Sequence, residues 1–232
     1  MAGVMVDRCA TGIPGFDNIC QGGLVRNSSN VLIGGPGSGK TTFMLQFLWN
    51  GATKYNENGL YCSFEPDILE TLKDGMSYGW DFTKLNEQDR VKFLKFSPQT
   101  SVQELTTELT GLIAKYDVKR ICFDPISVLA MAQENDGKIR EMIFDLVSLL
   151  KRLKVTSVLA DETNDEEDKE RGEYFDKTEI IKFLADSVTI LSEEKKGNTG
   201  DRALKVSKMR RTLHFRNWAG MMIGSNGLAL SQ

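Results

Sequence analysis

The sequence predicts an α/β fold built on a mostly parallel sheet, with helices on both faces and antiparallel strands at its C-terminal end. Between residues 29 and 160, short apolar runs alternate with segments whose apolar residues recur at helical spacing. Strands separated by helices need right-handed crossovers, which place helices on both faces of a parallel sheet. After residue 186 the helical spacing stops, and short strands follow one another across turn sequences.

Each predicted element has its own signal in the sequence. Buried runs predict parallel strands at 29–34, 59–64, 91–96, 120–124 and 156–160. Apolar spacing predicts helices at 40–55, 67–79, 101–116 and 138–153, the third opened by a capping box of Ser101 and Glu104. The turn sequences "KKGNTGD", "RNWA" and "SNG" separate the expected antiparallel strands 187–193, 202–210, 220–224 and 228–231.

Composition limits the function classes. A chain of 232 residues with 41% apolar and 26% charged residues is expected to form one domain over 1–232. A net charge of −3 and a pI near 5.4 argue against a general nucleic-acid coat. We interpret Cys9, Cys20, Cys62 and Cys122 as reduced thiols, because they lack metal-binding spacing. No apolar run reaches the ~20 residues of a membrane span, and no signal peptide is evident, so we expect a cytoplasmic protein.

A phosphate-binding loop is predicted at residues 34–41. The stretch "GGPGSGKT" matches G-x-x-x-x-G-K-[ST] between a predicted strand and a predicted helix, the context that this motif requires. Lys40 is expected to reach the β- and γ-phosphates, and the Thr41 hydroxyl to bind Mg²⁺. The alternative, a glycine-rich turn with an incidental lysine, fits the complete match less well. We expect nucleotide contacts from Gly35, Pro36, Gly37, Ser38, Gly39, Lys40, Thr41 and Thr42.

Two carboxylates follow strands that would end beside this loop. Asp124 closes the apolar run of the fourth strand, where a second metal ligand would be placed. Glu65 closes the second strand, and the carboxyl ends of parallel strands share one edge of the sheet. We therefore predict that Glu65 is the base for an attacking water. The alternative is a carboxylate that only interacts with a helix N-terminus.

A cationic stretch, "KVSKMRRTLHFRN", covers residues 205–217 and holds the single histidine of the chain. Cations at even positions such as Lys208 and Arg210 alternate with apolar residues such as Leu213 and Phe215, as on a strand with two different faces. One face would pack on a core while the other presents cations to a negative partner. A solvated edge strand protected by charge would show the same alternation.

The sequence resembles the KaiC-like branch of the RecA superfamily from Thr11 to the C-terminus. The matching stretches are "TGIPGFD", "GGPGSGKTTFMLQFL", "GLYCSFE", "SYGWD", "RICFDPIS" and "KMRRTLH". This resemblance implies a RecA-type ATPase core that binds ATP and Mg²⁺ between the subunits of a hexameric ring. It also implies that Glu65 acts on the water. The residues expected to contact the ATP of the neighbouring subunit are Lys208, Met209, Arg210, Thr212 and His214.

Three departures from the family pattern are visible. Pro66 follows Glu65 where a second glutamate is common, and Arg211 stands where glycine is usual. Lys182-Phe183 occupies the place of the phosphorylated Ser–Thr pair of the clock protein, so autokinase activity is not expected.

Two other functions remain open at this stage. In recombinase-like relatives, the loops after the fourth and fifth strands touch DNA; here these loops are expected at 127–138 and 161–173. The second holds eight carboxylates against two cations, which should repel DNA. A nucleotide-gated scaffold for a protein partner is the third hypothesis. We favour a Mg²⁺-dependent ATPase that forms a homohexamer, with Lys208 and Arg210 stabilising the transition state.

Overall fold

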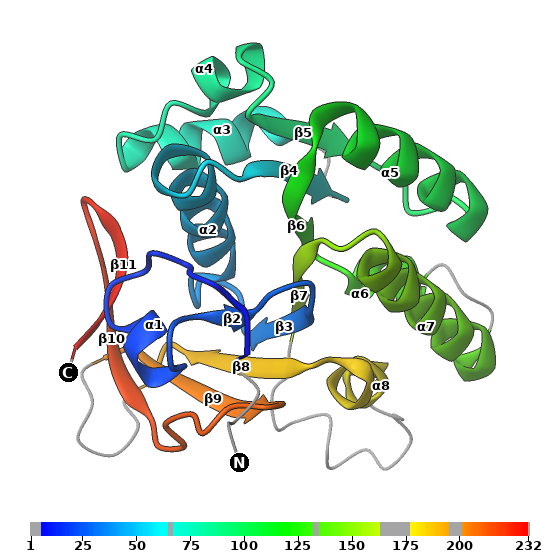
Figure 1. Ribbon diagram of the computed structural model, residues 1–232. Helices are drawn as coiled ribbons and strands as arrows, with labels where there is room; N and C mark the ends of the chain where they lie inside the picture. Colours follow the sequence, from blue (N-terminus) through cyan, green and yellow to red (C-terminus); the bar gives the residue numbers. More distant parts are fainter. Residues whose placement is uncertain (1–5, 65–66, 132–134, 163–176, 195–200, 232) are drawn as a thin grey trace.

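A nine-stranded mixed sheet forms the centre of the protein (Figure 1). The computed structural model describes residues 6–64, 67–131, 135–162, 177–194 and 201–231. Within these ranges the strands follow the order β11-β10-β9-β8-β3-β7-β6-β4-β5. Neighbours from β5 to β8 are parallel, and neighbours from β8 to β11 are antiparallel. The predicted fold class is therefore confirmed.

Five of the six parallel strands coincide with the apolar runs predicted as parallel strands. The sixth, at 187–192, was predicted as antiparallel, but it is parallel to the strand at 29–34 and antiparallel only to the strand that follows it. The six strands are β3 (Ser29–Gly34), β4 (Asn58–Ser63), β5 (Val91–Lys95), β6 (Val118–Asp124), β7 (Thr156–Glu162) and β8 (Ser187–Ser192). All six residues of β3 are buried, because β7 and β8 flank this strand and elements cover both faces of the sheet. The loop that follows β3 therefore leaves the sheet at the centre of its carboxyl edge.

The remaining strands extend the sheet beyond β8 or stand apart from it. The extension consists of β9 (Ala203–Met209), β10 (Ala219–Gly224) and β11 (Gly227–Ser231), the last two joined by a tight hairpin in which Gly224 pairs with Gly227. A separate antiparallel pair, β1 (Arg8–Cys9) and β2 (Leu24–Val25), was not predicted from the sequence. These two strands are too short to show a period-2 pattern.

Helices cover both faces of the sheet. One face packs against α1 (Phe16–Ile19), α2 (Lys40–Lys54), α3 (Ile68–Ser77) and α4 (Phe82–Glu87). The other packs against α5 (Val102–Tyr116), α6 (Ser127–Met131), α7 (Asp136–Arg152) and α8 (Lys177–Leu184). Within the described ranges, none of the helices combines the length and the apolar character that crossing a membrane requires.

Several short helices were not predicted. α1, α4 and α6 have only four to six residues, too few to display a helical period. α6 occupies the start of the segment 127–138, which was expected to be a loop. The predicted acidic loop begins with Asp161 and Glu162, which in the structure end β7, and the rest of that run lies outside the described residues.

The cationic segment differs from its predicted conformation. β9 ends at Met209, and Arg211 has a φ angle of 58°, in the left-handed region that an extended strand does not use. The alternation therefore stops at this residue. Leu213 is 86% exposed and Phe215 is 44% exposed, whereas the pattern placed both against a core. The strand predicted at 202–210 is present as β9, but the two-faced alternation does not continue to residue 216 as the pattern suggested.

Candidate nucleotide-binding site

The loop between β3 and α2 has the backbone shape of a phosphate cradle. β3 ends at Gly34 and α2 begins at Lys40. Between them, Gly37 and Gly39 have φ angles of 75° and 99°, which glycine adopts without strain. Left-handed residues in such a turn make concave nests of backbone N–H groups, and the N-terminus of the 15-residue helix α2 adds a dipole that favours an anion.

Two side chains of this loop bring buried polar groups to the cradle. Lys40 is 8% exposed, and its Nζ donates to the carbonyl oxygens of Gly34 at 2.8 Å and Gly35 at 2.9 Å. The ammonium group is thus held against the loop. The Ser38 hydroxyl oxygen is buried and has no hydrogen-bond partner among the residues that the structure describes. A buried polar group without a partner is costly, and phosphate oxygens would satisfy it.

The carboxylate of Asp124 lies next to the first turn of α2. The Thr41 hydroxyl donates to Asp124 Oδ2 at 2.8 Å, and the Tyr61 hydroxyl donates to the same oxygen at 2.5 Å. Burial raises the pKa of Asp124, while these two hydrogen bonds and the charge of Lys40 act in the opposite direction. Thr41 and Asp124, which were each predicted as metal ligands, are thus in contact, and Tyr61 is a contact that the sequence did not indicate.

Thr41 and Asp124 suit a magnesium ion. Mg²⁺ prefers oxygen ligands and is usually held by one or two protein groups together with phosphates of the substrate. A hydroxyl and a carboxylate that already touch each other at the mouth of a phosphate cradle meet this requirement. These two residues are therefore the ones that would hold the metal.

A cavity of about 360 Å³ opens beside the cradle, a size that accommodates a small-molecule ligand. Sequence reasoning missed three of its lining residues. Arg202, just before β9, donates to the carbonyl oxygen of Gly37 at 2.6 Å. Tyr78 comes from the "SYGWD" motif and contacts the Thr42 hydroxyl at 3.2 Å. The complete lining is Gly37, Gly39, Lys40, Thr41, Thr42, Tyr78, Arg202 and Ile223.

Glu65, the predicted base, lies outside the described residues. The chain before it can be followed to the site. β4 ends at Ser63, and the backbone N–H of Phe64 donates to the carbonyl oxygen of Asp124 at 3.0 Å. The chain therefore leaves β4 beside Asp124, at the edge of the sheet where the phosphate cradle lies.

Lys208 and Arg210, the cations predicted to contact the nucleotide, lie away from the cradle of their own chain. Lys208 Nζ donates to the carbonyl oxygens of Lys182 and Phe183 at 3.0 Å each, at the C-terminal end of α8. Arg210 Nη2 donates to the carbonyl oxygen of Phe183 at 3.4 Å, and its Nη1 lies 3.9 Å from Asp186 Oδ1. Both side chains therefore surround the end of α8.

The strand register places these cations at the edge of the sheet opposite the cradle. β9 runs antiparallel to β8, so that Met209 pairs with Ser187, the first residue of β8. β8 is parallel to β3, and the cradle follows the last residue of β3. A strand of six residues spans about 17 Å. Within one copy of the chain, Lys208 and Arg210 are thus separated from the cradle by the length of a strand.

The other predicted residues of the cationic segment are partly engaged within the chain. Met209 is 5% exposed and its side chain belongs to the core. The Thr212 hydroxyl accepts a hydrogen bond from Arg8 at 2.8 Å. His214 Nδ1 lies 3.3 Å from the carbonyl oxygen of Thr212. Arg211 has a left-handed backbone, a conformation that glycine adopts without strain.

The motif "TGIPGFD" has a structural role in the described chain. Asp17 accepts hydrogen bonds from the Thr11 backbone and hydroxyl, at 2.9 and 2.7 Å, and from the Gly12 backbone at 2.9 Å. Asn50 of α2 donates to the carbonyl oxygen of Thr11 at 3.0 Å. The motif thus fixes a turn against the helix that carries Lys40.

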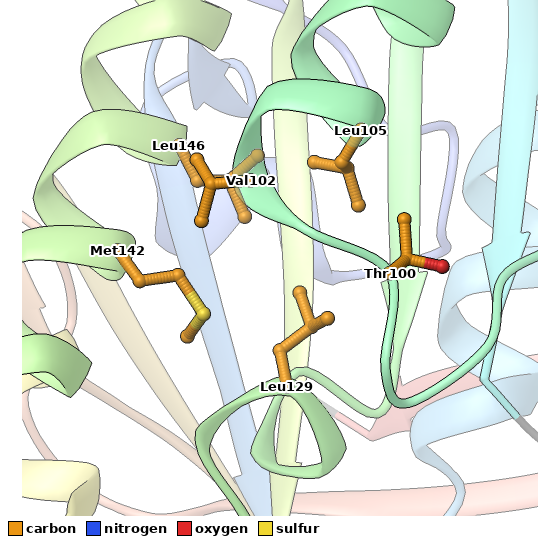
Figure 2. Close-up of a pocket in the computed structure, with 6 residues that line it drawn as sticks. All are labelled: Thr100, Val102, Leu105, Leu129, Met142 and Leu146. Atoms are coloured by element: carbon orange, nitrogen blue, oxygen red, sulfur yellow. The ribbon is translucent and has the colours of Figure 1, made fainter. Parts of the chain in front are cut away.

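A second hollow lies between α5, α6 and α7, away from the cradle (Figure 2). Its volume of about 10 Å³ is close to that of a single water probe. It has no charged lining residue to orient a ligand, so we assign it no site. The lining residues are Thr100, Val102, Leu105, Leu129, Met142 and Leu146.

Comparisons of the sequence with known proteins agree on one family. The sequence matches the family model described as "ATPase: KaiC" over residues 9–232. It is 32% identical to the circadian clock oscillator protein KaiC of Parasynechococcus marenigrum, over 98% of this chain and 45% of that protein. It is 29% identical to KaiC of Synechococcus elongatus, over 96% of this chain and 44% of that protein. The chain therefore spans less than half the length of these curated relatives.

A solved structure agrees with this similarity. The crystal structure of a KaiC-like protein from Pyrococcus horikoshii OT3 superposes with a TM-score of 0.84 at 30% identity. The match covers 98% of this chain and 100% of that one. The sheet order and the cradle described above thus occur within a fold already known for a KaiC-like chain.

Proposed function

The chain belongs to the KaiC ATPase family, and from this premise we propose that it hydrolyses ATP with Mg²⁺, as a ring of identical subunits with active sites at the subunit interfaces. Six subunits are expected from the family resemblance. The observation that carries the interface proposal is the separation within one chain between the cradle and the cations Lys208 and Arg210. Residues that cannot meet their own phosphate site can meet that of the next copy.

The side of the site within one chain would bind and orient the nucleotide. Lys40, whose ammonium contacts two loop carbonyls, would turn to the β- and γ-phosphate oxygens. Thr41 and Asp124 would hold Mg²⁺, which neutralises charge on the phosphates when it is bound. Glu65 would position or deprotonate the water that attacks the γ-phosphate in line.

The side contributed by the neighbouring subunit would stabilise the transition state. Negative charge is distributed over the γ-phosphoryl oxygens during transfer, and cations aimed at it contribute strongly to the rate. Lys208 and Arg210 are the candidates. Their contacts with the end of α8 fix their direction before a second copy arrives.

Exposed apolar side chains beside these cations support a protein partner. Phe183 is 77% exposed and Leu213 is 86% exposed. Beside the cavity, Met222 of β10 is 63% exposed and precedes the lining residue Ile223. Contiguous exposed apolar patches mark contact surfaces, and these side chains would form part of two such patches in the ring. Two different surfaces that complement each other produce a head-to-tail contact, which closes into a ring when the rotation permits.

Phosphate release by the purified protein tests this function. We expect Mg²⁺-dependent release from ATP, a ring-sized mass by light scattering in the presence of ATP, and no stimulation by single-stranded DNA. Lys40→Ala serves as the control that removes the charge of the cradle. ATP binding and assembly without turnover would instead favour the scaffold hypothesis. Submicromolar DNA binding with a steep salt dependence would favour the recombinase-like one.

A further inference from the structure

We propose that Tyr61 is a positioning residue for the metal-binding carboxylate of Asp124. This inference rests on the proposed function, because it assumes that Asp124 serves a magnesium ion. The Tyr61 hydroxyl lies 2.5 Å from Asp124 Oδ2. It would act through Asp124 and lies outside the proposed ligand set.

The ring of Tyr61 is anchored where the hydroxyl can reach the site. The residue is 1% exposed, and its ring centroid lies 5.3 Å from that of Phe93 on β5. In the sheet, Tyr61 pairs with Cys122 on β6, and Ser63 pairs with Asp124. Tyr61 thus starts two pairs before Asp124 on the face that packs against α2, and its long side chain extends towards the carboxyl edge.

Two donors converge on one oxygen of the carboxylate. Thr41 and Tyr61 both donate to Asp124 Oδ2, from α2 and from β4 respectively. Rotation of the carboxylate would break both hydrogen bonds at once. Thr41 is itself a proposed metal ligand, so its hydroxyl has a second task. Tyr61 can restrain the carboxylate independently of that task.

A buried and restrained carboxylate gains more from this hydrogen bond than an exposed one would. Asp124 is 6% exposed, and burial disfavours its charged form. A hydroxyl donor offsets part of that cost and fixes the direction of the oxygens. Partners that hydrogen-bond to metal ligands typically contribute about 10–100-fold to metal affinity. Loss of the Tyr61 hydroxyl should therefore raise the Mg²⁺ concentration that the protein requires.

The test measures the affinity for ADP by calorimetry, for Tyr61→Phe and for the unchanged protein. Each protein is measured in excess Mg²⁺, over a series of Mg²⁺ concentrations, and in EDTA. We expect about a tenfold higher Mg²⁺ concentration for half-maximal enhancement of ADP affinity. Affinity in EDTA should stay within about twofold, because the cradle is unchanged. The matched control is Tyr116→Phe, which removes a hydroxyl at the distant end of α5 and should leave the Mg²⁺ requirement unchanged.

Asp124→Asn separates this inference from the proposed function. If Asp124→Asn leaves the Mg²⁺ requirement unchanged, the metal role of Asp124 fails, and the inference fails with it. If Asp124→Asn raises the requirement but Tyr61→Phe does not, the inference alone is overturned. In the Asp124→Asn background, Tyr61→Phe should add no more than about twofold, because it acts through the missing carboxylate.

A second measurement applies if Tyr61→Phe fails to fold. The crystal structure of the unchanged protein with ADP and Mg²⁺ should retain the hydrogen bond between the Tyr61 hydroxyl and Asp124. A hydroxyl turned away from Asp124 in that structure would overturn the positioning role.

Discussion

Lys40 supplies the charge on which the phosphate site depends. Its Nζ is held by Gly34 and Gly35 in the cradle, and its side chain is almost fully buried. The pattern of the loop predicted that this residue and Thr41 open the helix after the cradle, because the spacing of a phosphate-binding loop fixes the local backbone. The position of Asp124 at the end of a strand was also predicted from the sequence, and the structure places its carboxylate in contact with Thr41.

Other residues at the site could not be predicted in this way. Tyr61 was part of an apolar run, and its contact with Asp124 depends on which strands are neighbours in the sheet. Arg202 lies 165 positions from its partner Gly37 in the sequence. Local patterns contain no information about such pairings, which arise from the strand order of the whole sheet.

Substitutions of Lys40 and Glu65 should give different defects. Lys40→Ala should weaken ATP binding, because the cradle loses its cation. Glu65→Gln should bind ATP with unchanged affinity and slow hydrolysis by about 10²-fold or more, as expected for loss of a general base. Binding is measured by calorimetry and turnover by phosphate release. Normal turnover by Glu65→Gln would remove this residue from the mechanism.

Among the elements, a buried cluster of ion pairs links β6, the start of β4 and α2. Arg120 on β6 is 1% exposed, and its Nη2 lies 2.6 Å from Glu57 Oε2. Arg26 Nη1 lies 2.6 Å from Glu57 Oε1. Arg120 also donates to the carbonyl oxygen of Phe47 on α2 at 2.9 Å. The cluster thus ties β6 to the residue before β4 and to the helix that carries Lys40.

Removing the carboxylate of this cluster should destabilise the fold in a pH-dependent manner. Burial acts to raise the pKa of Glu57, but Arg120 and Arg26 outweigh it, and the net pKa is lowered. The ion pairs therefore stabilise the fold above the unfolded-state pKa of about 4.3, and this contribution is lost as the pH falls through the lower folded-state value. Glu57→Gln should lower the free energy of unfolding at pH 7 by about 3 kcal/mol.

Urea denaturation between pH 3 and 7 measures this effect. The difference between Glu57→Gln and the unchanged protein should shrink towards the acid end. The control is Glu70→Gln, which removes an exposed pair with Lys73 on α3 and should cost less than about 1 kcal/mol. An equal difference at every pH would show that the Glu57 charge is not the source of the stabilisation.

The longer elements were largely predictable, whereas the short helices, α8 and the β1–β2 pair were not. Buried runs located β3, β4, β5, β6 and β7, because two covered faces make such strands continuously apolar. β8 was predicted as a strand but with the wrong direction, since it is parallel to β3. The cationic segment followed the alternation of a strand only to Met209. Alternation in a sequence does not reveal a left-handed residue such as Arg211, so the exposed Leu213 could not be foreseen.

At the scale of the molecule, the sheet separates the two halves of the proposed active site. The cradle follows the carboxyl end of β3, and Lys208 and Arg210 lie at the opposite edge, beside the end of α8. A ring that repeats one head-to-tail contact would bring the cations of each copy to the cradle of the next. The central claim is therefore that hydrolysis requires two subunits.

Mixing two inactive variants tests this claim most directly. Arg210→Ala should bind ATP and assemble but barely hydrolyse it, since an arginine finger contributes about 10³-fold or more. Glu65→Gln should be nearly inactive for its own reason. In randomly mixed equimolar rings, about a quarter of all interfaces would pair an intact Glu65 with an intact Arg210. A mixture of Glu65→Gln with Lys40→Ala is the control, because both lesions lie on one side of the interface and no complete site can form.

The measurement is phosphate release after subunit exchange, with mixed rings verified by a tag on one variant. Activity should return in the mixture of Arg210→Ala with Glu65→Gln and stay absent in the control mixture. Verified mixed rings without any recovered activity would contradict a site shared between subunits. Lys208 and Arg210 would then serve only to hold the end of α8, where the structure places them.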